Sequence, residues 1–121
     1  DSVAVRPGHP MALARLGERW LLALPGNPQS AIVALLSLGK PLVESMLGRW
    51  DPRLPVVTLG AAAEAPAHEH RLLACRLSEQ AHPVAHLGSA MLRGLAAADG
   101  FAVLPPGGAN AGDEVAWLRL P

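Results

Sequence analysis

Apolar and polar positions alternate along the first part of the chain in the manner of β-strands. Alternation over residues 3–5 and 11–16, on either side of a Pro-Gly-His-Pro turn at residues 7–10, predicts two short strands that pair with each other. After a second turn at residues 17–19, an apolar run at residues 20–24 predicts a strand buried on both faces. The chain is therefore expected to begin with three closely spaced strands.

A helical pattern follows this third strand. Between residues 29 and 47 the apolar side chains recur at helical spacing and form one stripe. Asn27 is a favourable N-cap, and Pro28 suits the first helical position, where an N–H would have no helical partner. Pro41 removes one internal hydrogen bond and is expected to kink or split the helix near residues 37–39.

A domain boundary is expected just after this helix. Gly48 is placed to end the helix, and residues 49–55, which are rich in turn formers, break both patterns. Beyond them, one helix is predicted over residues 89–99 among short segments with strand character. The fold class that follows is an α/β segment over residues 1–48 and a small, mostly-β domain over residues 49–121. The predicted strands of that domain are residues 54–59, 72–77, 83–87, 101–104 and 115–120.

Composition excludes several classes of function. With 50% hydrophobic residues among 121, the chain can bury a core and is not disordered. A formal net charge of +0 with 17% charged residues argues against non-specific nucleic-acid binding, and 3% aromatic residues leave little for base stacking. No apolar run reaches the roughly 20 residues of a membrane span, and the chain opens with neither Met nor a signal peptide. We therefore expect the C-terminal part of a longer protein, with no nucleic-acid or membrane partner.

The single cysteine, Cys75, excludes an internal disulfide and a thiolate metal cage, and it fits a reducing, cytoplasmic setting. At a strand position it is expected to be a small buried hydrophobic residue rather than a nucleophile. The nearby histidines are His68, His70, His82 and His86. They lack the spacing of metal ligands, and Pro83 prevents a helical pair, so no metal site is predicted.

The junction between the strand at residues 20–24 and the helix is the first candidate site. A Pro-Gly turn that leads into a capped helix presents free backbone N–H groups and the positive end of the helix dipole at one point, which attracts anions. Gly26 permits close backbone approach, and the side chains of Asn27 and Ser30 offer hydrogen bonds. The alternative is a well-capped strand–helix connector without a ligand. The candidate substrate-binding residues are Pro25, Gly26, Asn27, Pro28 and Ser30.

Four segments of the sequence resemble one known family. They are Arg-Pro-Gly-His-Pro-Met-Ala at residues 6–12, Leu-Pro-Gly-Asn-Pro-Gln-Ser at 24–30, Ser-Ala-Met-Leu at 89–92 and Asp-Gly-Phe-Ala-Val-Leu-Pro at 99–105. In this order they are similar to the MoeA/gephyrin E-domain family, the molybdopterin molybdotransferases. The resemblance implies that residues 1–48 close a three-layer α/β molybdopterin-binding domain and that residues 49–121 form a β-barrel-like C-terminal domain.

The same resemblance implies a reaction and its partners. Molybdate is inserted into adenylylated molybdopterin, Mg²⁺ takes part, and AMP leaves. The enzyme is expected to be a cytoplasmic homodimer, with its cleft between the α/β domain of one subunit and the β domain of the other. The acidic segment that the family uses for its site would lie upstream of this chain, so the chain alone is expected to be inactive. The alternative is a non-catalytic, gephyrin-like scaffold or peptide-binding module.

Three residues are candidate catalytic residues by this resemblance. Arg6 stands where the family usually carries a lysine, Arg76 matches a strand arginine that faces the cleft, and Ser89 matches a hydroxyl near the molybdate. Both substrates are anions, so positive groups suit the site. The alternatives are a surface strand residue for Arg6, a rim-exposed arginine with a packed stem for Arg76, and a helix N-cap for Ser89. The family pattern is not kept at His9, Arg93 and Gly94.

Overall fold

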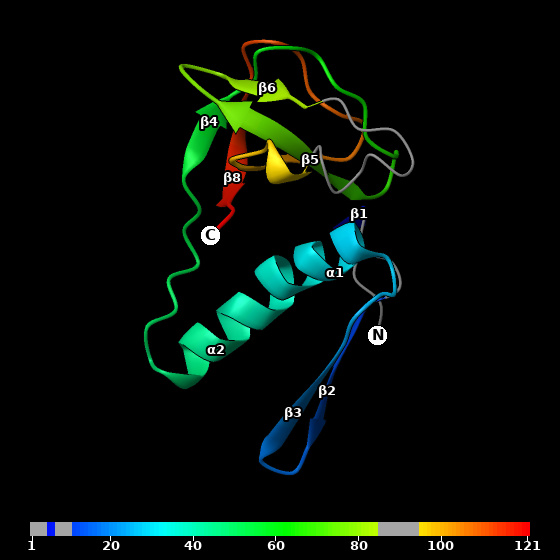
Figure 1. Ribbon diagram of the computed structural model, residues 1–121, viewed down its shortest axis with the longest axis vertical. Helices are drawn as coiled ribbons and strands as arrows, with labels where there is room; N and C mark the ends of the chain where they lie inside the picture. Colours follow the sequence, from blue (N-terminus) through cyan, green and yellow to red (C-terminus); the bar gives the residue numbers. More distant parts are fainter. Residues whose placement is uncertain (1–4, 7–10, 85–94) are drawn as a thin grey trace. The chain divides into compact units, whose positions relative to one another are not determined.

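The computed structural model describes residues 5–6, 11–84 and 95–121, and only the backbone of residues 5 and 6. Its contacts divide the chain into two compact units, Asp1–Pro52 and Arg53–Pro121. Figure 1 shows a hairpin and a long helix in the first unit and a curled sheet in the second. No helix in the described ranges is long and apolar enough to cross a membrane.

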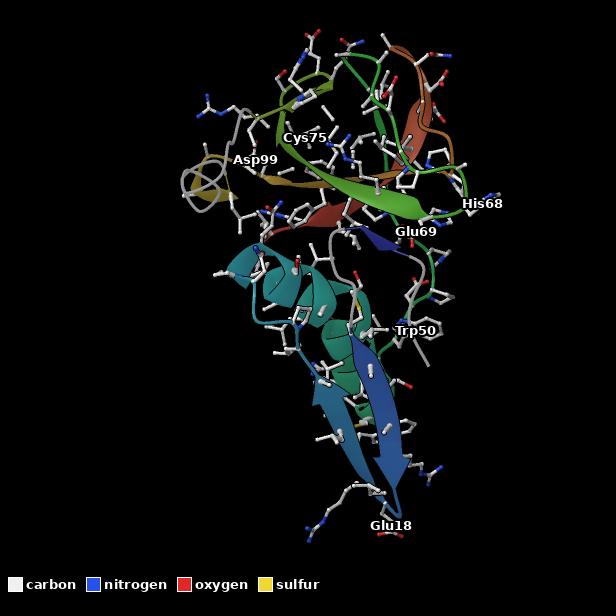
Figure 2. All side chains as sticks on the ribbon, turned by 90° about the vertical axis from the view of Figure 1, so that its right-hand side faces the viewer. Glu18, Trp50, His68, Glu69, Cys75 and Asp99 are labelled. Carbon is white, nitrogen blue, oxygen red and sulfur yellow. The ribbon has the colours of Figure 1, made fainter. Side chains whose placement is uncertain are left out.

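The first unit contains a two-stranded antiparallel sheet of β2 (Ala12–Leu16) and β3 (Arg19–Ala23). The two-residue turn between them consists of Gly17, at φ +64, and Glu18, which lies at the tip of the hairpin in Figure 2. The predicted pairing of β2 with the strand before it is wrong, since β1 (Val5–Arg6) is not part of this sheet. The short turn favours β3 as the partner because it brings the two strands into register with little loss of loop entropy.

A helix with a widened middle turn follows the hairpin. It consists of α1 (Pro28–Ala34), a π-helical turn (Leu35–Gly39) and α2 (Lys40–Met46), which confirms the predicted helix. The change of geometry falls where it is predicted, because the N–H of residue 40 donates to the carbonyl five residues back. In an α-helix the ring of Pro41 would clash with the carbonyl four residues before it, and the wider turn relieves this crowding.

Both ends of this helix are capped as predicted. At its start, the side chain of Asn27 accepts a hydrogen bond from the N–H of Ser30 at 3.1 Å. At its end, Gly48 has φ +70, and its N–H donates to the backbone carbonyl three residues earlier. The N–H of Arg49 donates to the Glu44 carbonyl at 2.8 Å. This pair of bonds is a Schellman motif, which favours glycine because other residues rarely adopt a positive φ.

Strand β3 is more exposed than its sequence predicts. Trp20, Leu21 and Leu24 are 42, 55 and 44% exposed, so the prediction of a strand buried on both faces is wrong for this chain. One face does pack on the helix: Leu22 is half-buried, and its Cδ2 would lie 3.3 Å from a Cβ added at Gly39. Among the described residues nothing covers the Leu21 side of the strand. The three-layer α/β arrangement of residues 1–48 therefore stays a prediction.

The second unit is an antiparallel sheet in the order β6–β5–β7–β8–β4. The strands are β4 (Val56–Thr58), β5 (His70–Leu77), β6 (Ala81–Pro83), β7 (Gly100–Leu104) and β8 (Glu114–Arg119). Four of them overlap the predicted segments, whereas β6 ends at Pro83, where the predicted strand begins. Of the helix predicted over residues 89–99, residues 95–96 are helical and residues 89–94 lie outside the described ranges.

The sheet curls until its two edges meet at one point. Leu59, just after β4, forms an isolated parallel bridge with Ala81 of β6, and the N–H of Gly60 donates to the Ala81 carbonyl at 2.8 Å. The curl encloses a small apolar core of Leu59, Leu73, Cys75, Ala81, Ala102, Leu104, Val115 and Trp117. The unit is thus a curled half-barrel, which confirms the prediction of a small, mostly-β domain.

Candidate functional site

The strand–helix junction opens onto a hollow in the first unit. The hollow measures about 470 Å³ and is lined by Pro25, Gly26, Asn27 and Ser30 together with Met11, Ala12, Ala23 and Leu24. Asn27 lies at the N-cap, outside the helix, and both Gly26 and Asn27 are exposed. The turn can therefore be reached from solvent, as a ligand-binding turn requires.

The hydrogen-bond donors of this turn are few. Its two prolines carry no N–H, and the N–H of Ser30 already donates to Asn27. At most, the backbone amides of Gly26, Asn27 and Gln29 remain for a ligand. No charged side chain is among the residues described as lining the hollow. An anion held here would need positive charge from another part of the protein.

Two candidate catalytic residues have no described side chain. Arg6 belongs to β1, of which the structure describes the backbone. Ser89 lies outside the described ranges, as do His9, Arg93 and Gly94. The roles predicted for Arg6 and Ser89 stay predictions.

Arg76 lies near the end of β5 in the second unit. Strand alternation predicts that its side chain shares a face with Ala74 and is opposite Cys75. The structure agrees, because Cys75 belongs to the enclosed core, while Arg76 is exposed and lies across from His82 of β6. Within the described residues the guanidinium of Arg76 has neither a hydrogen-bond nor an ion-pair partner.

Arg71, near the start of the same strand, is occupied by a structural contact. Its Nη1 donates to the carbonyl of Glu64 at 2.8 Å, which ties the preceding loop to β5. Figure 2 shows the labelled side chains of His68 and Glu69 just before this end of the strand. Of the two arginines on β5, Arg76 is the more exposed, and its guanidinium is the one without a partner among the described residues.

Asp99 is a site component that sequence reasoning missed. Its Oδ2 accepts a hydrogen bond from the N–H of Leu77 at 2.7 Å, and its own N–H donates to the Cys75 carbonyl at 2.9 Å. Figure 2 shows Asp99 and Cys75 close together at this end of β5. These two bonds flank Arg76. The sequence signal that could have identified Asp99 is its place directly before a strand, since aspartate side chains often accept a hydrogen bond from a backbone N–H.

The described histidines and carboxylates of the second unit do not gather into a metal-binding group. Within the described ranges, no group of three or more His, Cys, Asp or Glu side chains could hold a metal ion. His82 lies with its ring against Gly60, where an added Cβ would meet it. A metal-dependent step would need ligands from outside these residues.

The Cys75 thiol is buried and held in its neutral form. Burial raises its pKa from an ordinary 9.0 to about 11, against smaller lowering effects from a backbone hydrogen bond with Ala102 and the charge of Arg71. Because the folded state holds this proton more tightly, the corresponding stability is present below about pH 9 and is lost as the pH rises towards 11. This environment suits a packing residue and not a nucleophile.

At pH 8, the folded chain is expected to react with iodoacetamide at least about 100-fold more slowly than the chain unfolded in denaturant. A thiol with a pKa of about 11 has roughly 100-fold less thiolate than one at 9.0, and burial further restricts access. Mass spectrometry of the alkylated chain gives a clear result because Cys75 is its one cysteine. Equal rates in the two states would contradict a buried, neutral thiol.

Taken together, these features define a class of protein in which a hairpin and a capped helix precede a small curled β-domain with an exposed strand-end arginine. Residues 56–120 match the family model of the MoeA C-terminal region (domain IV), and the chain belongs to this family.

Relatives and solved structures agree with this assignment. A molybdopterin molybdenumtransferase of Haemophilus influenzae is 40% identical over 53 residues, which are 44% of this chain and 13% of that protein. Molybdopterin molybdenumtransferase 2 of Mycobacterium tuberculosis is 32% identical over 108 residues, 85% of this chain and 27% of that protein. The chain thus spans about a quarter or less of the length of these relatives.

The fold is shared with solved structures from archaea. The molybdopterin biosynthesis MoeA protein of Pyrococcus horikoshii matches 98% of this chain and 30% of its own, at a TM-score of 0.78 and 25% identity. A molybdenum cofactor biosynthesis protein of Pyrococcus furiosus matches 99% of this chain and 44% of its own, at a TM-score of 0.77. At 20% identity the second likeness concerns the fold alone.

Proposed function

We propose that this chain is the C-terminal part of a molybdopterin molybdenumtransferase that inserts molybdate into adenylylated molybdopterin during molybdenum cofactor biosynthesis. The observation that carries the proposal is the match of residues 56–120 to the MoeA C-terminal region. The names of the two bacterial relatives support the same activity. Since the chain covers 27% of the longer-matching relative, the activity is proposed for the complete polypeptide.

In this proposal Arg76 contacts an anionic substrate. It is exposed at a strand end and has no partner within the described residues, so its guanidinium can receive molybdate or a phosphate group. A planar guanidinium donates two parallel hydrogen bonds to such an oxyanion, which fixes the direction of binding. The substrate would lie on the α/β domain of the other subunit of a homodimer.

The turn at residues 25–30 is proposed to bind the same substrate through its backbone. The amides of Gly26, Asn27 and Gln29 can donate to a phosphate or molybdate oxygen, and the open hollow leaves room for it. Since the described lining is uncharged, Arg6 is proposed to supply the positive charge. Ser89 is proposed to donate a further hydrogen bond near the molybdate.

Mg²⁺ does not fit the residues described in this chain. No group of three or more metal-ligating side chains is found among them, and Mg²⁺ is bound chiefly by carboxylates, phosphates and water. Its ligands are therefore proposed to come from outside the chain, and no step is assigned to Mg²⁺ through these residues. A cytoplasmic location belongs to the same proposal.

Arg76→Ala in the complete polypeptide tests the proposal. Loss of a charge-assisted hydrogen bond of about 1.5–3 kcal/mol is expected to lower kcat/KM for molybdate insertion by roughly 10- to 150-fold. The melting temperature should change by less than about 2 °C, because substitutions of exposed side chains have small effects on stability. AMP release, cofactor formation and thermal unfolding are measured on the same preparations.

Arg19→Ala is the matched control, because Arg19 is an exposed strand arginine at the start of β3 that has no role in the proposed site. It should leave kcat/KM within about twofold of the wild type. Unchanged turnover in Arg76→Ala would exclude the role of Arg76. Peptide binding by a complete polypeptide that releases no AMP would instead favour a scaffold.

A further inference from the structure

Asp99 completes the hydrogen bonding of β5 at the point where the neighbouring strand stops. Strand β7 begins at Gly100, which is paired with Cys75, so no β7 residue lies beside the last two residues of β5. There the N–H of Leu77 donates to Asp99 Oδ2 at 2.7 Å, in place of a backbone carbonyl. A side chain thus supplies the acceptor that the sheet no longer offers.

The residue between the two bonds of Asp99 is Arg76. On one edge of β5, the bonds from Asp99 hold the Cys75 carbonyl and the Leu77 N–H. On the other edge, β6 pairs with the same stretch, with His82 opposite Arg76. Asp99 is held in turn, because its carbonyl accepts from the N–H of Leu120 at 3.0 Å. The backbone on both sides of Arg76 is therefore fixed, although strand ends commonly open.

We infer that Asp99 is a positioning residue for Arg76. Its carboxylate holds the end of β5 so that the long arginine side chain leaves the sheet in one direction, towards the anionic substrate. Ordering this backbone in advance reduces the conformational entropy that is lost when the substrate binds. The inference rests on the proposed function of Arg76. Asp99 acts here through the backbone, since its Oδ2 accepts from the N–H of Leu77.

Three substitutions separate the hydrogen bond of Asp99 from its other properties. Asp99→Ala removes the acceptor, and Asp99→Asn removes the charge but keeps an oxygen that can accept from Leu77. Asp113→Ala is the matched control, because Asp113 Oδ2 accepts from a backbone N–H, that of Asn110, at 2.9 Å in a loop of the same unit. The control loses the same kind of bond at a place where it does not flank Arg76.

Amide hydrogen exchange of Leu77, measured by NMR on this chain, tests the contact. Asp99→Ala should speed exchange at Leu77 about tenfold or more, since the opened amide loses its one acceptor. Asp99→Asn should stay close to the wild type, and Asp113→Ala should leave Leu77 unchanged. Full protection of Leu77 in Asp99→Ala would overturn the inference, whatever the role of Arg76.

A double-mutant cycle in the complete polypeptide tests whether the contact acts through Arg76. Asp99→Ala is expected to lower kcat/KM about tenfold, whereas Asp99→Asn should keep most of the wild-type kcat/KM. When Asp99→Ala is added to Arg76→Ala, it should lower kcat/KM no further. An equal loss in the Arg76→Ala background would overturn the inference, because a merely structural role persists there. A different outcome is that Arg76→Ala keeps full activity while the Leu77 amide exchanges faster in Asp99→Ala. That combination would overturn the proposed role of Arg76 itself.

Discussion

Purified on its own, this chain is expected to form no molybdenum cofactor and to release no AMP, even with Mg²⁺, molybdate and adenylylated molybdopterin in excess. A divalent cation that bridges phosphate groups needs oxygen ligands, mainly carboxylates. Within the described ranges no group of three or more metal-ligating side chains comes together. The chain also matches 27% of the longer-matching relative, so most of the residues of that enzyme have no counterpart here. The expected result is complete loss of turnover.

Chromatography of AMP and a cofactor-reconstitution assay measure this result against a sample without protein. Weak binding of substrate without turnover is expected, because Arg76 and the backbone amides of Gly26 and Asn27 can still donate hydrogen bonds. Activity above the sample without protein would show that carboxylates outside this chain are dispensable. The division of roles proposed for the complete enzyme would then be wrong.

Gly100→Ala is expected to destabilise the second unit strongly. A Cβ at this position would lie 2.5 Å from the Leu118 carbonyl oxygen and 2.5 Å from Cζ2 of Trp117. Neither can move freely, because Leu118 lies in β8 opposite β7 and Trp117 is 4% exposed in the core. Overpacking of this kind destabilises by about 3 kcal/mol, which lowers the melting temperature of so small a domain by roughly 12–24 °C.

Thermal unfolding followed by circular dichroism measures the effect, with Gly107→Ala as the control. Gly107 has φ +86 and nothing within 4 Å of an added Cβ, so this control reports backbone strain without overpacking. Strain of that kind amounts to about 1–2 kcal/mol. A melting temperature for Gly100→Ala equal to that of Gly107→Ala would show that Trp117 moves aside at little expense.

Signals confined to a few neighbouring residues predicted local structure well. The Asn27 cap, the Pro41 distortion and the Gly48 terminus of the first-unit helix were all predicted, and the structure confirms each of them. Each depends on backbone hydrogen bonds within one or two helical turns, which the sequence determines directly. The strand pattern of the second unit was predicted from the alternation of side chains, which is also a local signal, and this alternation correctly placed Arg76 on the face of β5 opposite Cys75.

Pairing and coverage were predicted less well, because they depend on segments that are distant in the sequence. An apolar run at residues 20–24 indicates burial, but the exposed Leu21 shows that a strand face is buried only where another layer covers it. The alternation in β2 likewise does not identify its partner, which is β3, paired with it across the two-residue turn at Gly17 and Glu18.

By itself, the sequence determined the helix with its caps and most strands of the β-domain. Only the tertiary structure decided how the sheet curls around Cys75 and that Asp99 holds the end of β5. The hydrogen bond from Leu77 to Asp99 joins residues 22 positions apart, and no periodicity in the sequence relates them. It forms because the antiparallel pairing of β5 and β7 stops at Gly100 and leaves one amide of β5 without a strand partner, next to a carboxylate.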